Sequence, residues 1–304
     1  MSQPDLAIPS LYNVKGKIVL VTGGSSGLGK MFATGFAQNG AKVYIASRKE
    51  AQLKAAVAEI SKSAKGPVNY IVANVGSKAG CDALISELKK RENKLHVLVN
   101  NSGITWGGPY SDFPEEKGWD NIFNVNVKSI FYMSAGLTDL LSKDANSYDP
   151  GRIINISSVA SVSPHAETPL AADGNGTWSY QPSKAAVNHL TSVLALKLGP
   201  QHITVNAIVP GYEKLTIVCN PSTDSLIYFL SVFPSRMTSF GFQNAGEEAF
   251  TSVQPTGRVG SPQDAAGVVL FLSSPASAHV TGAHIILDGG ARFVSAPIAP
   301  STKL

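Results

Sequence analysis

Lys17-Ile-Val-Leu-Val-Thr-Gly-Gly-Ser-Ser-Gly-Leu-Gly-Lys-Met-Phe32 is the stretch of sequence that decides the fold. Its first six residues form a nearly unbroken apolar run, which is typical of a strand buried on both faces of a parallel sheet. Glycines follow at once, and apolar residues then recur at helical spacing. A strand, a glycine turn and a helix in this order bring backbone amides and a helix N-terminus close to a phosphate group. The turn is therefore predicted to bind a nucleotide cofactor through Gly23, Ser25, Ser26, Gly27, Leu28 and Gly29.

The rest of the chain alternates between strand and helix patterns. Apolar runs of strand length recur at residues 42–46, 68–73, 95–99, 151–156, 203–209 and 282–290. Helical spacing recurs at residues 78–91, 119–141, 180–198 and 262–272. This alternation predicts an α/β fold, a single-domain doubly wound parallel sheet of the Rossmann type. We expect the domain to span residues 16–293, between a loose N-terminal arm at 1–15 and a tail at 294–304.

Composition excludes several classes of protein. The 304 residues are 43% hydrophobic and carry a net charge of +4 that is spread along the chain, so nucleic-acid binding has no support. Two cysteines and six histidines without ligand spacing predict neither a disulfide framework nor a metal site. The chain has no apolar run of membrane-spanning length and no secretory signal pattern, so we expect a cytoplasmic protein. The last three residues resemble a peroxisomal address with the wrong first position, which makes the peroxisome the weaker alternative.

Tyr180 and Lys184 form the candidate acid of the chain. They lie four residues apart at the start of a predicted helix, so their side chains share one face. A lysine charge nearby favours the phenolate and is expected to lower the pKa of the tyrosine from about 10 towards the range useful in acid catalysis. Alone, such a pair more often belongs to a surface helix. Together with the glycine turn it predicts a proton donor beside a bound cofactor.

Ser47 and Arg48 follow the second predicted strand, where a carboxylate would bind the 2′-hydroxyl of NAD. No acidic residue is present there, and the guanidinium instead suits the 2′-phosphate of NADP. The alternative is that Arg48 is a solvated charge at a helix start. NADP is therefore favoured over NAD.

Three amides are candidate polar contacts at the cofactor. Asn100-Asn101-Ser102-Gly103 ends a strand, and Asn101 and Gly103 are expected to contact a ribose or to support the neighbouring strands. Asn126 lies among apolar residues of a helical pattern, so its amide must find partners, for which a backbone carbonyl and a water are candidates.

Taken together, these motifs resemble those of the short-chain dehydrogenase/reductase family over roughly residues 14–293. The matching features are the glycine turn, Asn100 to Gly103, Ser158, the Tyr180 and Lys184 pair, and Pro210-Gly211. Several further segments most resemble the NADPH-dependent 3-oxoacyl reductases of the rhamnolipid-associated type. They are residues 105–107, 118–119, 233–238 and 257–260.

The resemblance implies roles for individual residues. The catalytic group is expected to be Asn126, Ser158, Tyr180 and Lys184, with Asn126 ordering a water that resupplies the proton. Ser158 would hydrogen-bond the substrate oxygen as charge develops on it. Further contacts to the cofactor are expected from Tyr180, Lys184, Asn74, Val75, Pro210, Gly211 and Thr238. Family members assemble through their helices, so a homotetramer or homodimer is implied.

The sequence departs from the family pattern in three places. Asn74 stands where an aspartate commonly contacts the adenine, and 22 residues separate Ser158 from Tyr180, more than is usual. An atypical insertion at residues 212–232 splits two family motifs. It is either a lid over the cleft or, as we favour, a translated intron. Displacement of Thr238 by this segment would impair activity.

Three functions remain open from the sequence. The leading one is an NADPH-dependent reductase of a small carbonyl substrate, with 3-oxoacyl thioesters as a candidate class. The others are a cofactor-binding regulator without turnover and an alcohol dehydrogenase that uses NAD. The identity of the substrate is beyond the sequence, because the predicted pocket includes the least regular segments.

Overall fold

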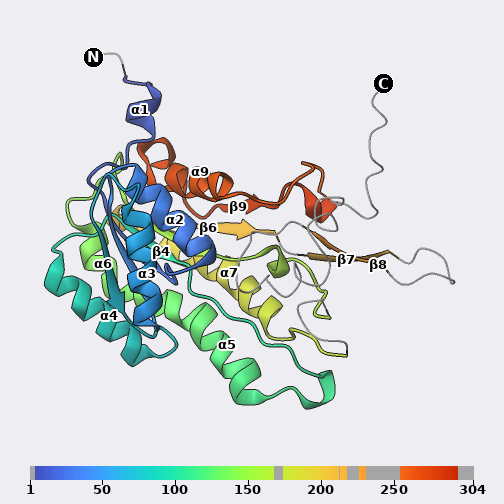
Figure 1. Ribbon diagram of the computed structural model, residues 1–304. Helices are drawn as coiled ribbons and strands as arrows, with labels where there is room; N and C mark the ends of the chain where they lie inside the picture. The colour runs from blue at the N-terminus through green and yellow to red at the C-terminus, as the bar shows by residue number, and fades with distance from the viewer. Residues whose placement is uncertain (1–3, 168–173, 212, 218–225, 231–253, 294–304) are drawn as a thin grey trace, which may run out of the picture.

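The computed structural model describes residues 4–167, 174–211, 213–217, 226–230 and 254–293. Its centre is a seven-stranded sheet in the order β3-β2-β1-β4-β5-β6-β9, in which all neighbouring strands are parallel (Figure 1). This confirms the predicted Rossmann-type fold. The strands are β1 (Ile18–Thr22), β2 (Lys42–Ser47), β3 (Val68–Val72), β4 (Val97–Asn100), β5 (Gly151–Ile156), β6 (Ile203–Pro210) and β9 (His284–Leu287).

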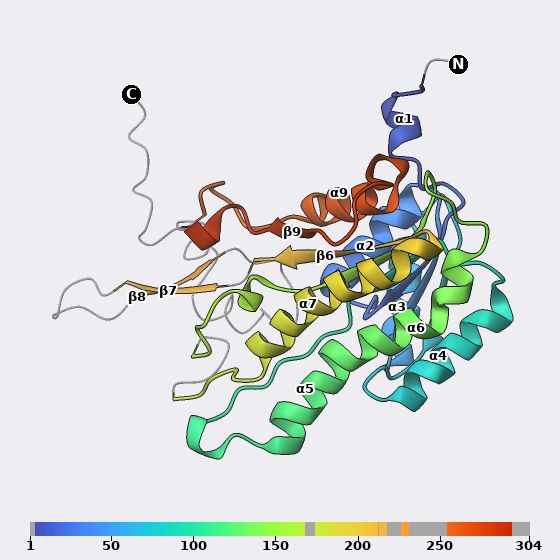
Figure 2. The ribbon, with the colours of Figure 1, turned by 180° about the vertical axis from the view of Figure 1, so that it is seen from behind.

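Helices cover both faces of the sheet, because alternate residues of each strand point to opposite faces. In β1, Leu20 packs with one buried cluster, while Val19 and Val21 pack with the other. The Leu20 face is covered by α4 (Lys78–Arg91), α6 (Ser129–Ser142) and α7 (Tyr180–Leu198). The other face is covered by α2 (Gly27–Gln38), α3 (Glu50–Ser61) and α9 (Pro262–Ser273). Figures 1 and 2 show these two helical layers from opposite sides.

The N-terminal arm is more ordered than the sequence indicated. A single helical turn, α1 (Ile8–Leu11), precedes β1, and Val14 is fully buried in the core. The ring of Tyr12 lies 6.4 Å from that of Phe271 on α9. The arm is therefore attached to the domain at Tyr12 and Val14, while Ile8 of α1 remains exposed, and the domain bounds stay a prediction.

The predicted long helix at 119–141 is real but begins earlier and is not uniform. Helical backbone runs from Glu115 to Ser142, and two π-helical stretches, Glu115–Asp120 and Asn124–Lys128, flank the short α5 (Asn121–Phe123). Asn126 lies in the second of them. Such stretches are often found at functional sites.

The predicted insertion contains a separate hairpin. β7 (Glu213–Ile217) pairs antiparallel with β8 (Leu226–Leu230) and extends beyond the carboxyl end of β6 (Figure 1). The rest of the insertion, the loop 168–173 and the tail 294–304 lie outside the described residues. The lid and the intron both stay predictions.

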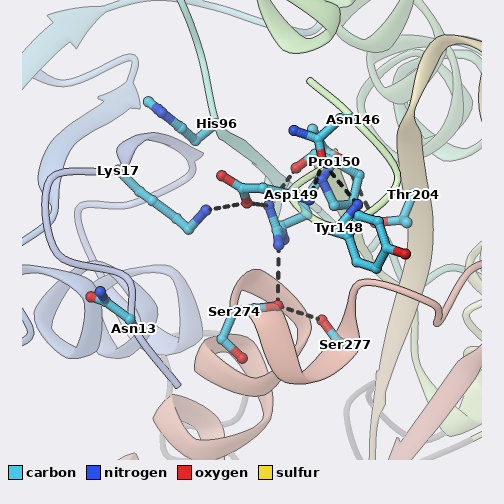
Figure 3. Close-up of polar contacts among 12 residues, drawn as sticks. Asn13, Lys17, His96, Asn146, Tyr148, Asp149, Pro150, Thr204, Ser274 and Ser277 are labelled. Carbon is cyan, nitrogen blue, oxygen red and sulfur yellow. Dashed lines mark hydrogen bonds and ion pairs between the residues drawn. The ribbon is translucent and has the colours of Figure 1, made fainter. Parts of the chain in front are cut away.

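A buried ionic cluster closes the amino end of the sheet (Figure 3). Arg152 of β5 is 1% exposed and donates from Nη1 to Asp149 Oδ1 at 2.7 Å and from Nη2 to the Ser274 carbonyl at 3.2 Å. Lys17, also buried, donates to the same Asp149 oxygen at 2.7 Å. The Asp149 carboxylate thus joins Arg152 of β5 to Lys17, just before β1, and Arg152 in turn binds the end of α9.

Candidate active site

A cavity of about 470 Å³ opens at the carboxyl ends of the strands. This is where open α/β sheets bind their ligands. Most predicted site residues line it, namely Gly23, Ser25, Ser26, Gly27, Leu28, Ser47, Arg48, Asn74, Val75, Asn101, Gly103, Ser158, Tyr180, Lys184, Pro210 and Gly211. Gly29 and Asn126 do not line it, and Thr238 lies outside the described residues.

The glycine turn joins β1 to α2 as predicted. Gly23 has a φ of +66°, a left-handed conformation that disfavours other residues. A Cβ at Gly29 would collide with Asn101 Nδ2 and with the Gly23 carbonyl oxygen. The role of Gly29 in the structure is thus close packing of the helix start against the turn. The contact with cofactor predicted for it is not supported by its position.

Asn101 supports the turn. Its Nδ2 donates to the carbonyl oxygens of Thr22 at 3.0 Å and Gly23 at 3.2 Å, while its backbone N–H donates to Thr22 Oγ1. Of the two uses predicted for this residue, support of the neighbouring strand is confirmed. A ribose contact stays a prediction.

The far end of the cavity carries the residues predicted to select the cofactor. Ser47 Oγ is buried and has no hydrogen-bond partner in the described structure, and Arg48 beside it is exposed. A buried hydroxyl without a partner is costly unless a ligand satisfies it. Lys49 and Gln52 line the same end and were missed by the sequence reasoning, although Lys49 had been noted as a neighbouring charge.

Asn74 does not reach across the cavity. Its side chain is exposed and its Oδ1 accepts from the backbone N–H of Gly76 at 3.2 Å. A weakened contact between Asn74 and the adenine, expected because an amide stands where an aspartate is common, stays a prediction.

Tyr180, Ser158 and Lys184 come together at the other end of the cavity. Ser158 follows β5, and its hydroxyl lies close enough to the Tyr180 phenol to lower the pKa of that phenol. Lys184, 4% exposed, donates from Nζ to the Ile156 carbonyl oxygen at 2.8 Å. This Nζ lies 5.6 Å from the centre of the Tyr180 ring. One turn of α7 and the end of β5 therefore position all three side chains.

The electrostatics of this group differ from the sequence prediction. Burial raises the pKa of Tyr180 to about 12, and only the Ser158 hydrogen bond acts in the opposite direction. Burial also lowers the pKa of Lys184 to about 8. The expected net fall in the pKa of Tyr180 is wrong for this structure, because desolvation of the phenolate outweighs the groups that favour it.

Asn126 lies one layer behind these groups. Its Oδ1 accepts from the Ile104 N–H at 2.9 Å, and its Nδ2 donates to the Ile104 carbonyl and to Ser183 Oγ, both at 3.0 Å. The predicted backbone partner is confirmed. A Cβ at Gly103 would lie 3.5 Å from Lys184 Nζ and 3.6 Å from Asn126 Oδ1, so both polar atoms face the same small space. The water predicted there stays a prediction.

Several lining residues escaped the sequence reasoning. Most are strand ends or loop residues beside a motif, and one, Val125, lies in the π-helical stretch Asn124–Lys128; they are Ala73, Gly76, Ser102, Ile104, Val125, Ile156 and Ser157. No group of His, Cys, Asp and Glu in the described part of the chain could hold a metal ion. Among the described helices, none has the length and apolar character to cross a bilayer.

Comparison with known families decides the classification. The model described as short chain dehydrogenase matches residues 17–224. The chain belongs to the short-chain dehydrogenase/reductase family. Its members are oxidoreductases that use a nicotinamide cofactor. A second model, described as enoyl-acyl-carrier-protein reductase, matches residues 234–292, and β8 falls between the two matched stretches.

Individual relatives agree with this. The chain is 36% identical over 92% of its length to the rhamnolipids biosynthesis 3-oxoacyl-acyl-carrier-protein reductase of Pseudomonas aeruginosa, covering 97% of that protein. It is 33% identical over 91% of its length to the Thermotoga maritima 3-oxoacyl-acyl-carrier-protein reductase FabG, covering 98% of it. Among solved structures, the Pseudomonas aeruginosa RhlG/NADP complex superposes with a TM-score of 0.77 at 34% identity, covering 92% of this chain and 98% of that one. The predicted family resemblance is confirmed.

Proposed function

We propose that this protein is an NADPH-dependent reductase of carbonyl compounds, with 3-oxoacyl thioesters as the substrate class. The observation that carries the proposal is that Ser158, Tyr180 and Lys184 line the same cavity as Ser47 and Arg48. The two 3-oxoacyl reductases among the relatives support the substrate class. Their names describe those proteins, and the assays below test the extension to this chain.

The residues present suit a nicotinamide cofactor with a 2′-phosphate. The turn after β1 offers backbone amides at the start of α2 to a pyrophosphate, and Ser47 Oγ has no hydrogen-bond partner among the described residues. Arg48 would hold the 2′-phosphate by charge-assisted hydrogen bonds. A bound NADPH supplies the hydride that adds to the carbonyl carbon.

The chain itself supplies the proton and stabilises the developing charge. Because the pKa of Tyr180 is about 12, its phenol is protonated at neutral pH and is able to donate to the substrate oxygen. Ser158 would donate a hydrogen bond to that same oxygen as it becomes negative. Lys184 has a pKa of about 8 and remains largely charged at pH 7, so it would stabilise the phenolate left after proton transfer. Asn126 fixes Ile104 and so holds the loop beside this group.

Turnover tests the proposal directly. The protein should oxidise NADPH with a panel of ketones and 3-oxoacyl thioesters, and Tyr180→Phe should lower kcat by about 10²- to 10⁴-fold while NADPH binding persists. Tyr148→Phe, an 88% exposed tyrosine far from the cavity, is the matched control and should not change kcat. NADPH binding without turnover in the wild type would instead favour the regulator without activity.

Cofactor preference is tested by substitution at the second strand. Arg48→Ala should weaken NADPH binding by about ten- to a hundredfold, because one charge-assisted contact to phosphate is lost. NADH is the internal control, since it lacks the 2′-phosphate, and its dissociation constant should stay the same within about twofold. Equal loss for both cofactors, or tighter binding of NADH by the wild type, would contradict the NADP assignment.

A homodimer or homotetramer is proposed as the assembly. Its support is a set of exposed apolar side chains on neighbouring helices, with Phe131 on α6 at 48% and Leu196 on α7 at 84% exposure. Light scattering at several concentrations should give a mass above that of one chain. We also propose a cytoplasmic location, which a fluorescent fusion that leaves the C-terminus free would test against the peroxisome.

A further inference from the structure

A group of aromatic side chains lies beside the candidate active site and has no assigned role. This aromatic cluster consists of Trp106, Tyr110, Phe113, Trp119 and Trp178. The rings of Tyr110 and Trp178 meet edge to face at 5.1 Å, and those of Phe113 and Trp119 at 6.2 Å. Tyr110 is 79% exposed, and Trp106 and Trp119 are each 40% exposed. An exposed apolar surface of this kind usually marks a place where something binds.

Backbone and side-chain contacts hold the aromatic cluster in place. Gly108 and Gly176 exchange two backbone hydrogen bonds, at 3.1 and 2.9 Å, and Trp178 Nε1 donates to the Gly108 carbonyl at 2.9 Å. A Cβ at Gly118 would lie 2.5 Å from the Phe113 ring, so this glycine leaves room for the ring to lie flat on the backbone. These contacts fix two segments that are far apart in the sequence into one aromatic surface.

The same segments lead directly into the catalytic end of the cavity. Ile104 lines the cavity and is clamped by Asn126, two residues before Trp106. On the other side, Trp178 and Ser179 immediately precede Tyr180, and Ser179 donates its hydroxyl hydrogen to the Gly118 carbonyl. The extended chain after β4 runs between α5 and α7 towards this region (Figure 2). Short segments of chain thus connect the aromatic cluster to Ile104 and Tyr180, which line the catalytic end of the cavity.

We propose that the aromatic cluster binds the apolar chain of the carbonyl substrate and makes the enzyme selective for long-chain over short-chain ketones. This rests on the proposed reductase function. A carbonyl held by Tyr180 and Ser158 must extend its remaining atoms past the residues that flank them. Those flanking residues lead to aromatic rings whose faces and edges suit methylene groups. The Nζ of Lys117 lies 5.9 Å from the centre of the Trp106 ring.

The chain provides its own spectroscopic probe. All three of its tryptophans, Trp106, Trp119 and Trp178, belong to the aromatic cluster. Their emission therefore reports ligand binding there without any need for turnover. In the absence of cofactor, decan-2-one should shift the emission in a saturable manner, with half-saturation at least tenfold below that of propanone. Equal responses to the two ketones, or none, would overturn the proposal.

A variant tests the assignment to these side chains. Tyr110→Ala removes a largely exposed ring and should weaken the decan-2-one response by at least threefold. Tyr148→Ala, the equally exposed control outside the cluster, should match the wild type. A response that both variants retain in full would assign the binding elsewhere. A tryptophan emission that changes on simple dilution, together with a fall in mass, would show that a second copy covers the cluster, and would also overturn the proposal.

Kinetics separates this inference from the function on which it rests. Each methylene buried against the rings should lower KM by about fourfold, because its burial contributes about 0.8 kcal/mol. Measured NADPH oxidation with a KM independent of chain length would overturn the aromatic site and leave the reductase intact. Absence of NADPH oxidation with every ketone would reject the reductase, while the emission titration would still decide whether the cluster binds apolar chains.

Discussion

Asp149 is the anion on which the buried ionic cluster depends, and Asp149→Asn is expected to destabilise the fold strongly. Lys17 and Arg152 both donate to its Oδ1 at 2.7 Å, and their side chains are only 9% and 1% exposed. Burial acts first to raise the pKa of Asp149, yet the hydrogen bonds from these two cations outweigh it and lower that pKa overall. Removing the negative charge would leave two buried cations close together.

The magnitude follows from this geometry. Removing one partner of a fully buried ion pair costs roughly 3–5 kcal/mol. Because the Asp149 side chain is itself 51% exposed, solvent screens part of this, and we expect about 3 kcal/mol. That is about a hundredfold in the unfolding equilibrium, or a fall in Tm of about 5 °C for a chain of 304 residues.

The matched control is Asp139→Asn, which breaks a surface ion pair of the same 2.7 Å length with Lys89. Its partners are 37% and 63% exposed, so the cost should be no more than about 1 kcal/mol. Urea unfolding of both variants measures the difference. In 1 M salt any effect of Asp139→Asn should vanish, while that of Asp149→Asn should persist. If the two variants unfold within 1 kcal/mol of each other, the buried cluster does not act as described.

Two further predictions concern single residues. His96 accepts a hydrogen bond from the Ile18 N–H at Nδ1, and burial, followed by the charge of Lys17, lowers its pKa to about 4. The unfolded chain then binds more protons than the folded one between about pH 6.5 and 4. The contribution of His96 to stability should therefore be full above this window and decline as pH falls through it. His96→Gln should make the urea midpoint of unfolding less dependent on pH in this window. Gly29→Ala should cost about 1–3 kcal/mol and weaken NADPH binding more than tenfold, because its Cβ would strike Asn101 and the turn backbone. Gly267→Ala, which meets nothing within 4 Å inside α9, is the control and should be neutral or stabilising.

The order of strands and helices could be predicted because the local pattern and the tertiary structure agree. The apolar run before Gly23 reads as a buried strand and is one, and the helix expected at 180–198 has those bounds in the structure. The burial of Val14 could not be predicted, because it depends on contacts with side chains that lie far away in the sequence. Most strand ends differ by one or two residues in either direction, and β9 is shorter than the expected run because Gly282 and the residues after Leu287 lie in bends or turns.

Site residues that belong to a sequence motif could be predicted, whereas properties that depend on burial or on contacts in three dimensions could not. Tyr180, Ser158 and Lys184 were found because their spacing and order are distinctive. The pKa of Tyr180 was misjudged because desolvation depends on the surrounding protein, which a sequence does not display. The aromatic cluster was not predicted. Trp178 contacts Tyr110 because Gly108 pairs with Gly176, and no local sequence pattern indicates this pairing.

Strand β5 separates two tasks along its length. Arg152 near its beginning is locked into the ionic cluster, while Ser157 and Ser158 follow directly after its end and face the cavity. Six residues of strand span about 20 Å, beyond the roughly 10 Å within which substitutions usually influence each other's effect on stability. We therefore expect that substitutions in the substrate pocket for new ketones leave the stability contributed by the ionic cluster unchanged. Stabilising substitutions at the ionic cluster should likewise combine with any change in substrate specificity.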